Sequence, residues 1–85
     1  MSFYVYMLRC ADDTLYTGYT NDVPKRLEAH NTGEGAKYTR SRRPCRLVWV
    51  CACDTKSDAM KREYEIKQLT RQEKLKLIKI EPNNS

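Results

Sequence analysis

The sequence predicts a small α+β domain, in which helices flank a three-stranded antiparallel sheet. Three segments rich in aromatic and β-branched residues are expected to form strands, two of them adjacent near the N-terminus and the third at residues 46–53. Segments with a helical spacing of apolar residues follow the second and third strands, which gives the order β-β-α-β-α-α. A chain of 85 residues has room for one hydrophobic core, so we assign residues 1–80 to a single domain and 81–85 to a frayed tail.

The first two strands are expected to form a hairpin. Residues 3–10 and 15–19 have strand composition, and Asp12-Asp13-Thr14 between them is typical of a turn. Because side chains alternate along a strand, one face of each strand carries a defined set: Tyr4, Tyr6 and Leu8 in the first, Tyr16 and Gly18 in the second. The sequence permits both sets to lie on one side of the sheet without requiring it.

A helix is expected to follow the hairpin and to run to about His30. Asn21-Asp22 offers N-cap oxygens at its start. Pro24 suits the first helical turn, where no backbone N–H donor is needed, and Val23 and Leu27 supply an apolar stripe.

A basic segment comes next, opened by Gly33 and Gly35 and closed by Pro44. Between residues 33 and 46 the acidic residue Glu34 stands against five basic ones: Lys37, Arg40, Arg42, Arg43 and Arg46. In a chain of net charge +5, this concentration is typical of a surface that binds a polyanion, most simply nucleic acid. The alternative is an ordinary solvated surface. We take Lys37, Arg40, Arg42 and Arg43 as candidate nucleic-acid-binding residues.

The last part of the chain is expected to contain the third strand and two helices. The first helix begins at Thr55 or Ser57 and carries the apolar residues Ala59, Met60, Ile66 and Leu69. Thr70 and Glu73 have the spacing of a capping box, which starts a separate last helix. That helix carries Leu75, Leu77, Ile78 and Ile80 and ends before Pro82.

The composition argues against a membrane protein and against a structural metal site. No apolar run approaches the roughly 20 residues of a membrane span, and the N-terminus lacks signal-peptide features, so we expect a cytoplasmic protein with no membrane partner. In that compartment Cys10, Cys45, Cys51 and Cys53 are expected to be free thiols. Cys51 and Cys53 face the same side of a strand, but no second close pair or histidine completes a tetrahedral metal site.

Three polar side chains occupy helix positions that suit a functional site. Arg26 and His30 are four residues apart, so they share a helix face at the edge where the helix meets the sheet. Glu63 continues the core-facing spacing of Ala59 and Ile66, and such a carboxylate needs a charged partner or a bound cation. The partner could be Arg26 in a salt bridge, or a divalent metal ion. Taken alone, Arg26 and His30 are more simply explained as ordinary solvated residues.

The order and spacing of these elements resemble the GIY-YIG nuclease superfamily. The matching elements are Tyr4-Val5-Tyr6, Tyr16-Thr17-Gly18, Arg26, His30 and Glu63. The resemblance covers nearly the whole chain and is greatest to the small, stand-alone bacterial branch without an added DNA-binding domain. Two positions depart from the family pattern, since Tyr4 replaces a glycine and Thr17 replaces an isoleucine.

The resemblance implies a metal-dependent endonuclease that hydrolyses phosphodiester bonds in DNA, in repair or recombination. One divalent ion, Mg²⁺ or alternatively Mn²⁺, would be held by Glu63 as its sole protein ligand, with water and phosphate oxygens completing the shell. Arg26 would offset charge on the phosphoryl oxygens, and Tyr6 or Tyr16 would take the proton from the attacking water. A tyrosine base requires the cations of the site to lower its pKa.

Two further residues receive roles from the resemblance, and two other functions stay open. His30 would orient a tyrosine or relay a proton, and Gly18 would leave room for close approach. The chain could instead be a nucleic-acid-binding module that cleaves little, or a protein-interaction accessory whose polar cluster is structural. We expect DNA rather than RNA as the partner and no small-molecule cofactor. The complete polar set favours catalysis, because a pure binder has no need of a core-facing carboxylate.

Overall fold

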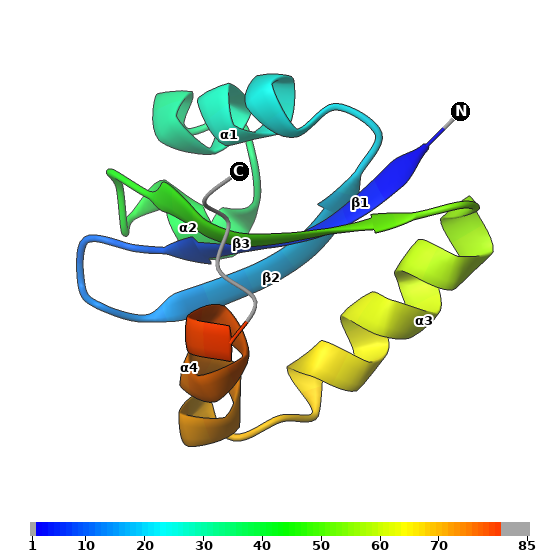
Figure 1. The fold of residues 1–85 in the computed structure, drawn as a ribbon. Helices are drawn as coiled ribbons and strands as arrows, with labels where there is room; N and C mark the ends of the chain where they lie inside the picture. The colour runs from blue at the N-terminus through cyan, green and yellow to red at the C-terminus, as the bar shows by residue number, and fades with distance from the viewer. Residues whose placement is uncertain (1, 81–85) are drawn as a thin grey trace.

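The computed structural model describes residues 2–80, the last of them by its backbone only. In this range the elements are β1 (Phe3–Arg9), β2 (Leu15–Thr20), α1 (Val23–Thr32), α2 (Lys37–Arg40), β3 (Arg46–Cys53), α3 (Lys56–Lys67) and α4 (Arg71–Ile80). The predicted fold class is confirmed. The antiparallel sheet has the order β2-β1-β3, with α1 and α2 on one face and α3 and α4 on the other (Figure 1). Within residues 2–80 no helix is long and apolar enough to cross a membrane, and the predicted C-terminal tail lies outside the described residues.

The hairpin forms as predicted, although β1 ends one residue earlier and β2 one residue later. Tyr6 pairs opposite Gly18, and Tyr16 lies on the same face of β2 as Gly18. The two tyrosine-bearing faces therefore share one side of the sheet. Asp12 closes the turn, because its Oδ1 accepts hydrogen bonds from the Thr14 amide at 3.2 Å and from the Thr14 hydroxyl at 2.6 Å.

The main hydrophobic core lies between the sheet and the helices α3 and α4. Its members are 0% exposed: Val5, Met7, Trp49, Ala59 and Ile66. The presence of Ala59 and Ile66 confirms the predicted inward face of α3. Cys51 and Cys53 pack against the same cluster, on one side of β3, and both are free thiols.

The opposite face of the sheet packs against α1, which carries the site. Its buried residues are Tyr6, Leu8, Cys10 and Cys45, with Leu27 of α1 packed against them. Asp22 caps α1, since its Oδ1 accepts a hydrogen bond from the Lys25 amide at 3.1 Å. Gly33 ends the helix with a φ of 89°, a left-handed conformation that glycine adopts without strain. The helix therefore runs two residues beyond its predicted end.

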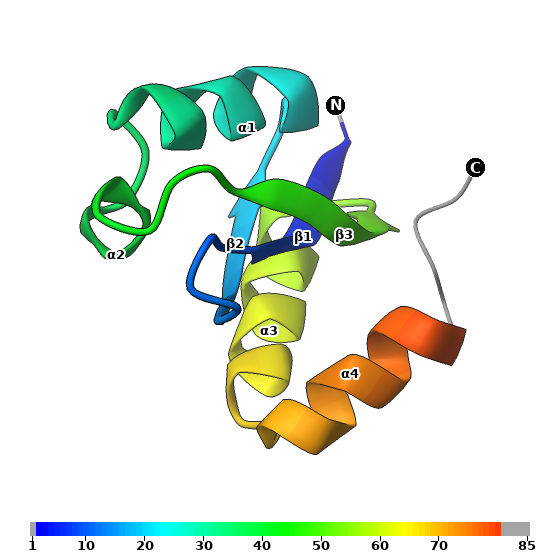
Figure 2. The same cartoon turned by 90° about the vertical axis from the view of Figure 1, so that its left-hand side faces the viewer.

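The sequence does not predict α2, a single helical turn inside the basic segment. This turn is too short to show a periodic apolar pattern, and its N-cap residue Ala36 offers no side-chain hydrogen bond. Contacts from distant residues hold it in place. Arg42 donates a hydrogen bond to Asp12 Oδ2 in the hairpin turn at 2.9 Å and another to the Tyr38 carbonyl at 2.8 Å. In Figure 2, α2 lies beside the C-terminal end of α1.

The starts of α3 and α4 follow the predicted capping chemistry. Thr55 rather than Ser57 caps α3, because its hydroxyl accepts a hydrogen bond from the Asp58 amide at 3.1 Å. The predicted capping box of α4 is confirmed. The Thr70 amide donates to Glu73 Oε1 at 2.8 Å, and the Glu73 amide donates to the Thr70 hydroxyl at 3.2 Å.

Candidate active site

The structure brings four of the predicted site residues together on the α1 face of the sheet. Tyr6 of β1 and Tyr16 of β2 lie beside each other, with ring centroids 6.4 Å apart. The His30 ring of α1 lies 5.8 Å from the Tyr6 ring and 5.1 Å from the Tyr16 ring, centroid to centroid. Arg26, one turn earlier on α1, is half-buried, and its charge shifts the pKa values of both Tyr6 and His30.

A chain of buried hydrogen bonds runs from the sheet through α1 to α2. The Tyr6 hydroxyl lies 2.8 Å from His30 Nε2, and His30 Nδ1 lies 2.7 Å from Thr39 Oγ1. The Thr39 hydroxyl donates in turn to the Ala36 carbonyl at 3.0 Å. His30 and Thr39 are 0% exposed and Tyr6 is 2% exposed. His30 is therefore not the ordinary solvated residue that the sequence left open.

Burial keeps both members of the Tyr6–His30 pair neutral at pH 7. Desolvation raises the pKa of Tyr6 to about 12; the Arg26 guanidinium acts against this increase, and electrostatic interaction with the Tyr16 and Glu63 side chains adds to it. Desolvation, with the Arg26 charge, lowers the pKa of His30 to about 4. The Arg26 charge thus lowers the Tyr6 pKa less than desolvation raises it, so the condition that the sequence set for a tyrosine base, a lowered pKa, is not met at Tyr6 in the free protein.

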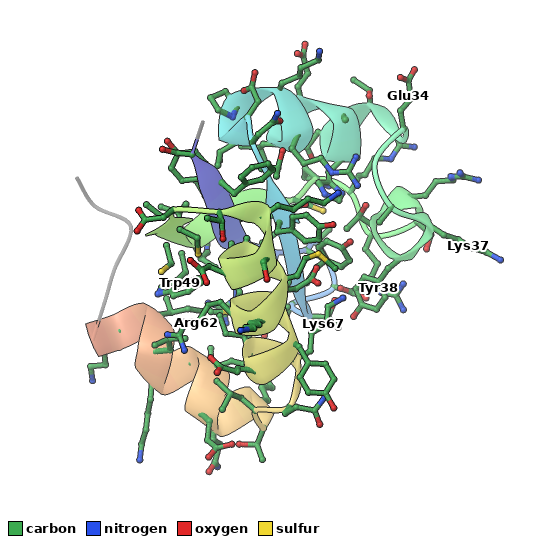
Figure 3. All side chains as sticks on the ribbon, turned by 90° about the vertical axis from the view of Figure 1, so that its right-hand side faces the viewer. Glu34, Lys37, Tyr38, Trp49, Arg62 and Lys67 are labelled. Carbon is green, nitrogen blue, oxygen red and sulfur yellow. The ribbon has the colours of Figure 1, made fainter. Side chains whose placement is uncertain are left out.

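Glu63 approaches the same site from the other side of the sheet. It lies on α3, which packs against β1 and β2, and its charge acts on the Tyr6 phenol. The salt bridge to Arg26, one of the two alternatives that the sequence left open, is not formed. Within residues 2–80 the ion pair of Glu63 is with Lys67, at 3.6 Å between Oε2 and Nζ, and the Glu63 side chain is 20% exposed. Figure 3 shows Lys67 on the same side of the molecule as Tyr38 of α2.

The donor set around Glu63 suits a weakly held, hydrated ion. No group of three or more His, Cys, Asp or Glu side chains within residues 2–80 could enclose a metal ion. Among the described residues Glu63 thus belongs to no cluster of three or more such side chains. Mg²⁺ usually binds proteins through one or two carboxylates and retains several water molecules, so this residue fits such an ion.

The lack of a side chain at Gly18 allows β2 to lie close to the tyrosine pair. A Cβ atom at this position would lie 2.6 Å from the Tyr6 hydroxyl oxygen and 2.8 Å from Cζ. The Tyr6 phenol thus lies directly over the β2 backbone, and Gly18 makes room for the protein's own side chain.

The two departures from the family pattern lie outside this cluster of rings. Tyr4 lines an apolar groove of about 460 Å³ between the start of α1 and β3, together with residues such as Pro24 and Val50. Thr17 is 3% exposed, and its buried hydroxyl has no hydrogen-bond partner within residues 2–80. Among the described residues neither Tyr4 nor Thr17 takes part in the hydrogen bonds and ring contacts of the polar cluster.

The four candidate nucleic-acid-binding residues divide into two pairs. Arg42 is tied to Asp12 and to the backbone as described above, and Arg43 donates from Nε to the Arg40 carbonyl at 2.9 Å. The side chains of Lys37 and Arg40 are exposed and form no hydrogen bond or ion pair within the part of the chain that the structure describes. Figure 3 shows Lys37 directed away from the body of the molecule.

Three residues of the site are not predicted from the sequence: Gly35, Tyr38 and Thr39. The Tyr38 ring stacks on Tyr16 with centroids 5.7 Å apart and an interplanar angle of 28°, and the Arg42 guanidinium lies 3.9 Å above Tyr38. Thr39 anchors His30. No local pattern in the sequence marks Tyr38 or Thr39; both lie in the basic segment between Gly33 and Pro44.

The family model of the GIY-YIG catalytic domain matches residues 2–76. The chain therefore belongs to the GIY-YIG family. This family is part of a nuclease superfamily whose substrates are nucleic acids and whose members generally use divalent metal ions. Its curated relatives include the UPF0213 protein of Staphylococcus aureus strain Mu3, 59% identical over 78 residues, which are 92% of this chain and 95% of the relative.

Two solved structures show the same fold. The solution NMR structure of the UPF0213 protein BH0048 from Bacillus halodurans is 48% identical, with a TM-score of 0.64, and the match covers 99% of this chain and 89% of that one. The solution NMR structure of the protein EF2693 from E. faecalis is 38% identical, with a TM-score of 0.62 and coverage of 94% and 86%.

Proposed function

We propose that this protein is a metal-dependent endonuclease that hydrolyses phosphodiester bonds in DNA. The observation that carries the proposal is the buried hydrogen bond between Tyr6 and His30, within electrostatic reach of Arg26 and Glu63. A neutral phenol that is hydrogen-bonded to a neutral imidazole can move a proton without forming a tyrosinate. Membership of the nuclease superfamily supports this use of the pair, and DNA repair or recombination is the role we propose for the activity.

In the proposed reaction Tyr6 and His30 remove the proton of the attacking water. The water proton passes to the Tyr6 oxygen while the Tyr6 proton passes to His30 Nε2, so the imidazole ends the step as an imidazolium. The water oxygen forms a bond to phosphorus, the bond to the leaving oxygen breaks, and that oxygen takes a proton from solvent. The negative charge of the bound phosphodiester opposes the effect of Arg26 and raises the His30 pKa above its value of about 4 in the free protein.

Arg26 and Glu63 have charge-stabilising roles in this proposal. The Arg26 guanidinium, next to the phenol, offsets negative charge that develops on the phosphoryl oxygens. Glu63 would hold one divalent ion, Mg²⁺ in preference to Mn²⁺, and a bound ion of this kind stabilises a leaving oxygen as a Lewis acid. Tyr16, which meets His30 through its ring, packs between the reacting groups and Tyr38.

A second candidate function is a nucleic-acid-binding module that cleaves little. Two observations within residues 2–80 favour it: the exposed, unpaired cations of Lys37 and Arg40, and the lack of any group of three or more His, Cys, Asp or Glu side chains that could hold a metal ion. Such a module would bind the phosphate backbone in a salt-dependent way and leave it intact.

A substrate panel separates the two functions. The protein is incubated with supercoiled plasmid, branched DNA, single-stranded DNA and RNA, in Mg²⁺ or in EDTA, and binding is measured in parallel by fluorescence anisotropy. We expect nicking of at least one DNA substrate in Mg²⁺ and none in EDTA. Binding without nicking on every substrate would replace the nuclease by the binding module, and cleavage confined to RNA would overturn the assignment to DNA.

A further inference from the structure

We infer that Thr39, together with Gly35, is a positioning residue that fixes which nitrogen of His30 carries the proton. A neutral imidazole has one N–H, on Nδ1 or on Nε2, and the hydrogen bond at one nitrogen determines the state of the other. The catalytic role of this positioning rests on the proposed function, because the proton relay requires an unprotonated Nε2 that can accept the Tyr6 proton. The contacts that carry it are independent of that function.

The hydrogen bonds around Thr39 determine which group donates and which accepts at each step between Tyr6 and the Ala36 carbonyl. A carbonyl oxygen can only accept, so the Thr39 hydroxyl, 3.0 Å from the Ala36 carbonyl, donates its single proton there. Its oxygen is then an acceptor towards His30 Nδ1, 2.7 Å away, which must carry the N–H. Nε2 is left with a lone pair directed at the Tyr6 hydroxyl, 2.8 Å away. Tyr6 therefore donates to His30, as the relay requires.

Gly35 provides the space in which this geometry is possible. A Cβ atom on Gly35 would overlap the imidazole at Nδ1, and it would lie 2.7 Å from Cγ and 2.8 Å from the Cα of His30. Contacts of this length with backbone and ring atoms cannot be relieved by a small side-chain rotation. Any larger residue at this position would displace the His30 ring from Thr39.

The α2 turn is what keeps Thr39 in place. Thr39 is 0% exposed, and the turn that bears it is fastened to the hairpin by the Arg42–Asp12 ion pair at 2.9 Å. The neighbouring residue Tyr38 stacks on Tyr16, so one helical turn contacts both the imidazole and the second tyrosine. We therefore expect a loss of the Thr39 hydroxyl to change the imidazole without removing the fold.

The first test reads the tautomer of His30 directly in the wild-type protein. His30 is the only histidine in the chain, so a long-range ¹H–¹⁵N correlation spectrum of the ¹⁵N-labelled protein contains one imidazole. At pH 7 we expect a protonated Nδ1 and an unprotonated Nε2, whose ¹⁵N shifts are well separated. An Nε2-protonated ring, or an even mixture of the two tautomers, would overturn the inference, whether or not the protein cleaves DNA.

Variants of Thr39 then separate positioning from packing. Thr39→Val keeps the shape and removes the hydroxyl, so we expect the ¹⁵N shifts to move towards a mixture of tautomers and kcat to fall by about tenfold or more. Thr39→Ser keeps the hydroxyl, and we expect it to restore both the wild-type tautomer and most of the rate. Wild-type shifts in Thr39→Val, or a Thr39→Ser variant as impaired as Thr39→Val, would contradict a positioning role.

Discussion

At the centre of the site, a phenol and an imidazole that are almost completely buried face each other across a 2.8 Å hydrogen bond. The sequence predicted both residues and left open whether Tyr6 or Tyr16 acts as the base. The burial of Tyr6 and His30 could not be predicted from the sequence, because it depends on how β1, α1 and α2 pack against one another. Burial moves the pKa values of Tyr6 and His30 in opposite directions, and for this reason the mechanism we propose uses a relay between neutral groups instead of a tyrosinate.

The depressed His30 pKa predicts a loss of stability in acid. The folded protein holds the imidazole neutral down to about pH 4, whereas the unfolded chain takes up a proton near the ordinary value of 6.5. The stabilisation is fully present above pH 6.5 and is lost as the pH falls towards 4, by about 3 kcal/mol at about 1.4 kcal/mol per pKa unit. Urea unfolding between these pH values measures it, with His30→Gln as the control that has no titrating group. Parallel pH dependence in both proteins would contradict the assignment.

The relay also predicts different outcomes for the two tyrosines. Tyr6→Phe removes the hydroxyl that is bonded to His30, so we expect kcat to fall by about 100-fold or more. Tyr16→Phe keeps the ring that packs between His30 and Tyr38, and we expect a smaller loss. Single-turnover cleavage rates check the comparison.

The pH dependence of the wild-type rate gives an independent check on the same mechanism. With Tyr6 protonated up to about pH 12 and His30 neutral above about pH 4, kcat/KM should be level across neutral pH. A rate that climbs tenfold per pH unit from neutral pH towards 10 would instead indicate a tyrosinate base, and Tyr16 would then be the better candidate.

At the scale of elements, local chemistry explains why most of the fold was predictable. The turn at Asp12, the cap at Asp22 and the capping box at Thr70 are formed by residues within three positions of one another, so their sequence patterns are reliable. The α2 turn has no such pattern, because Arg42 holds it through Asp12, which is 30 positions away. Thr39, and with it the anchor of His30, was missed for the same reason.

We expect the same substitution, threonine to valine, to have opposite effects on stability at two buried threonines that lie on different elements. Thr17 on β2 has a buried hydroxyl without a partner within residues 2–80, so Thr17→Val should be neutral or stabilise the fold by about 1 kcal/mol. Thr39 on α2 is bonded on both sides, so Thr39→Val should cost about 1–3 kcal/mol by leaving the His30 N–H unpaired. Urea unfolding at pH 7 checks both variants. A destabilising Thr17→Val would mean that its hydroxyl has a partner after all.

At the scale of the whole molecule, the site joins the two faces of the sheet. Tyr6, His30 and Arg26 belong to the α1 face, whereas Glu63 comes from α3 on the other face. The spacing of Glu63 with Ala59 and Ile66 predicted a core-facing carboxylate, whereas the Glu63 side chain is 20% exposed at the margin of that face. Its actual ion-pair partner, Lys67, was not predictable, because the choice between Lys67 and Arg26 depends on where α3 meets β2.

The distribution of free charge predicts which basic residues control binding to nucleic acid. Lys37 and Arg40 are exposed and unpaired within residues 2–80, so the double variant Lys37→Ala/Arg40→Ala should weaken DNA binding. It should also reduce the slope of log K against log salt by about 1 for each phosphate that the variant no longer neutralises. The matched control removes the exposed cations Lys76 and Lys79 of α4, on the other face of the sheet. Equal slopes for the two double variants would rule out the basic segment as the binding surface.

The metal dependence that we propose for the nuclease rests on Glu63, and matched substitutions of two glutamates on α3 test it. Glu63→Gln removes the charge beside Tyr6, whereas Glu65→Gln removes an exposed carboxylate that pairs with Arg62 at 3.4 Å. Single-turnover cleavage of DNA is measured in Mg²⁺ for both variants and the wild type. We predict a rate about a thousandfold lower for Glu63→Gln and a wild-type rate for Glu65→Gln. Equal cleavage by all three proteins would contradict a metal-binding role for Glu63 and the proposed metal-dependent nuclease with it.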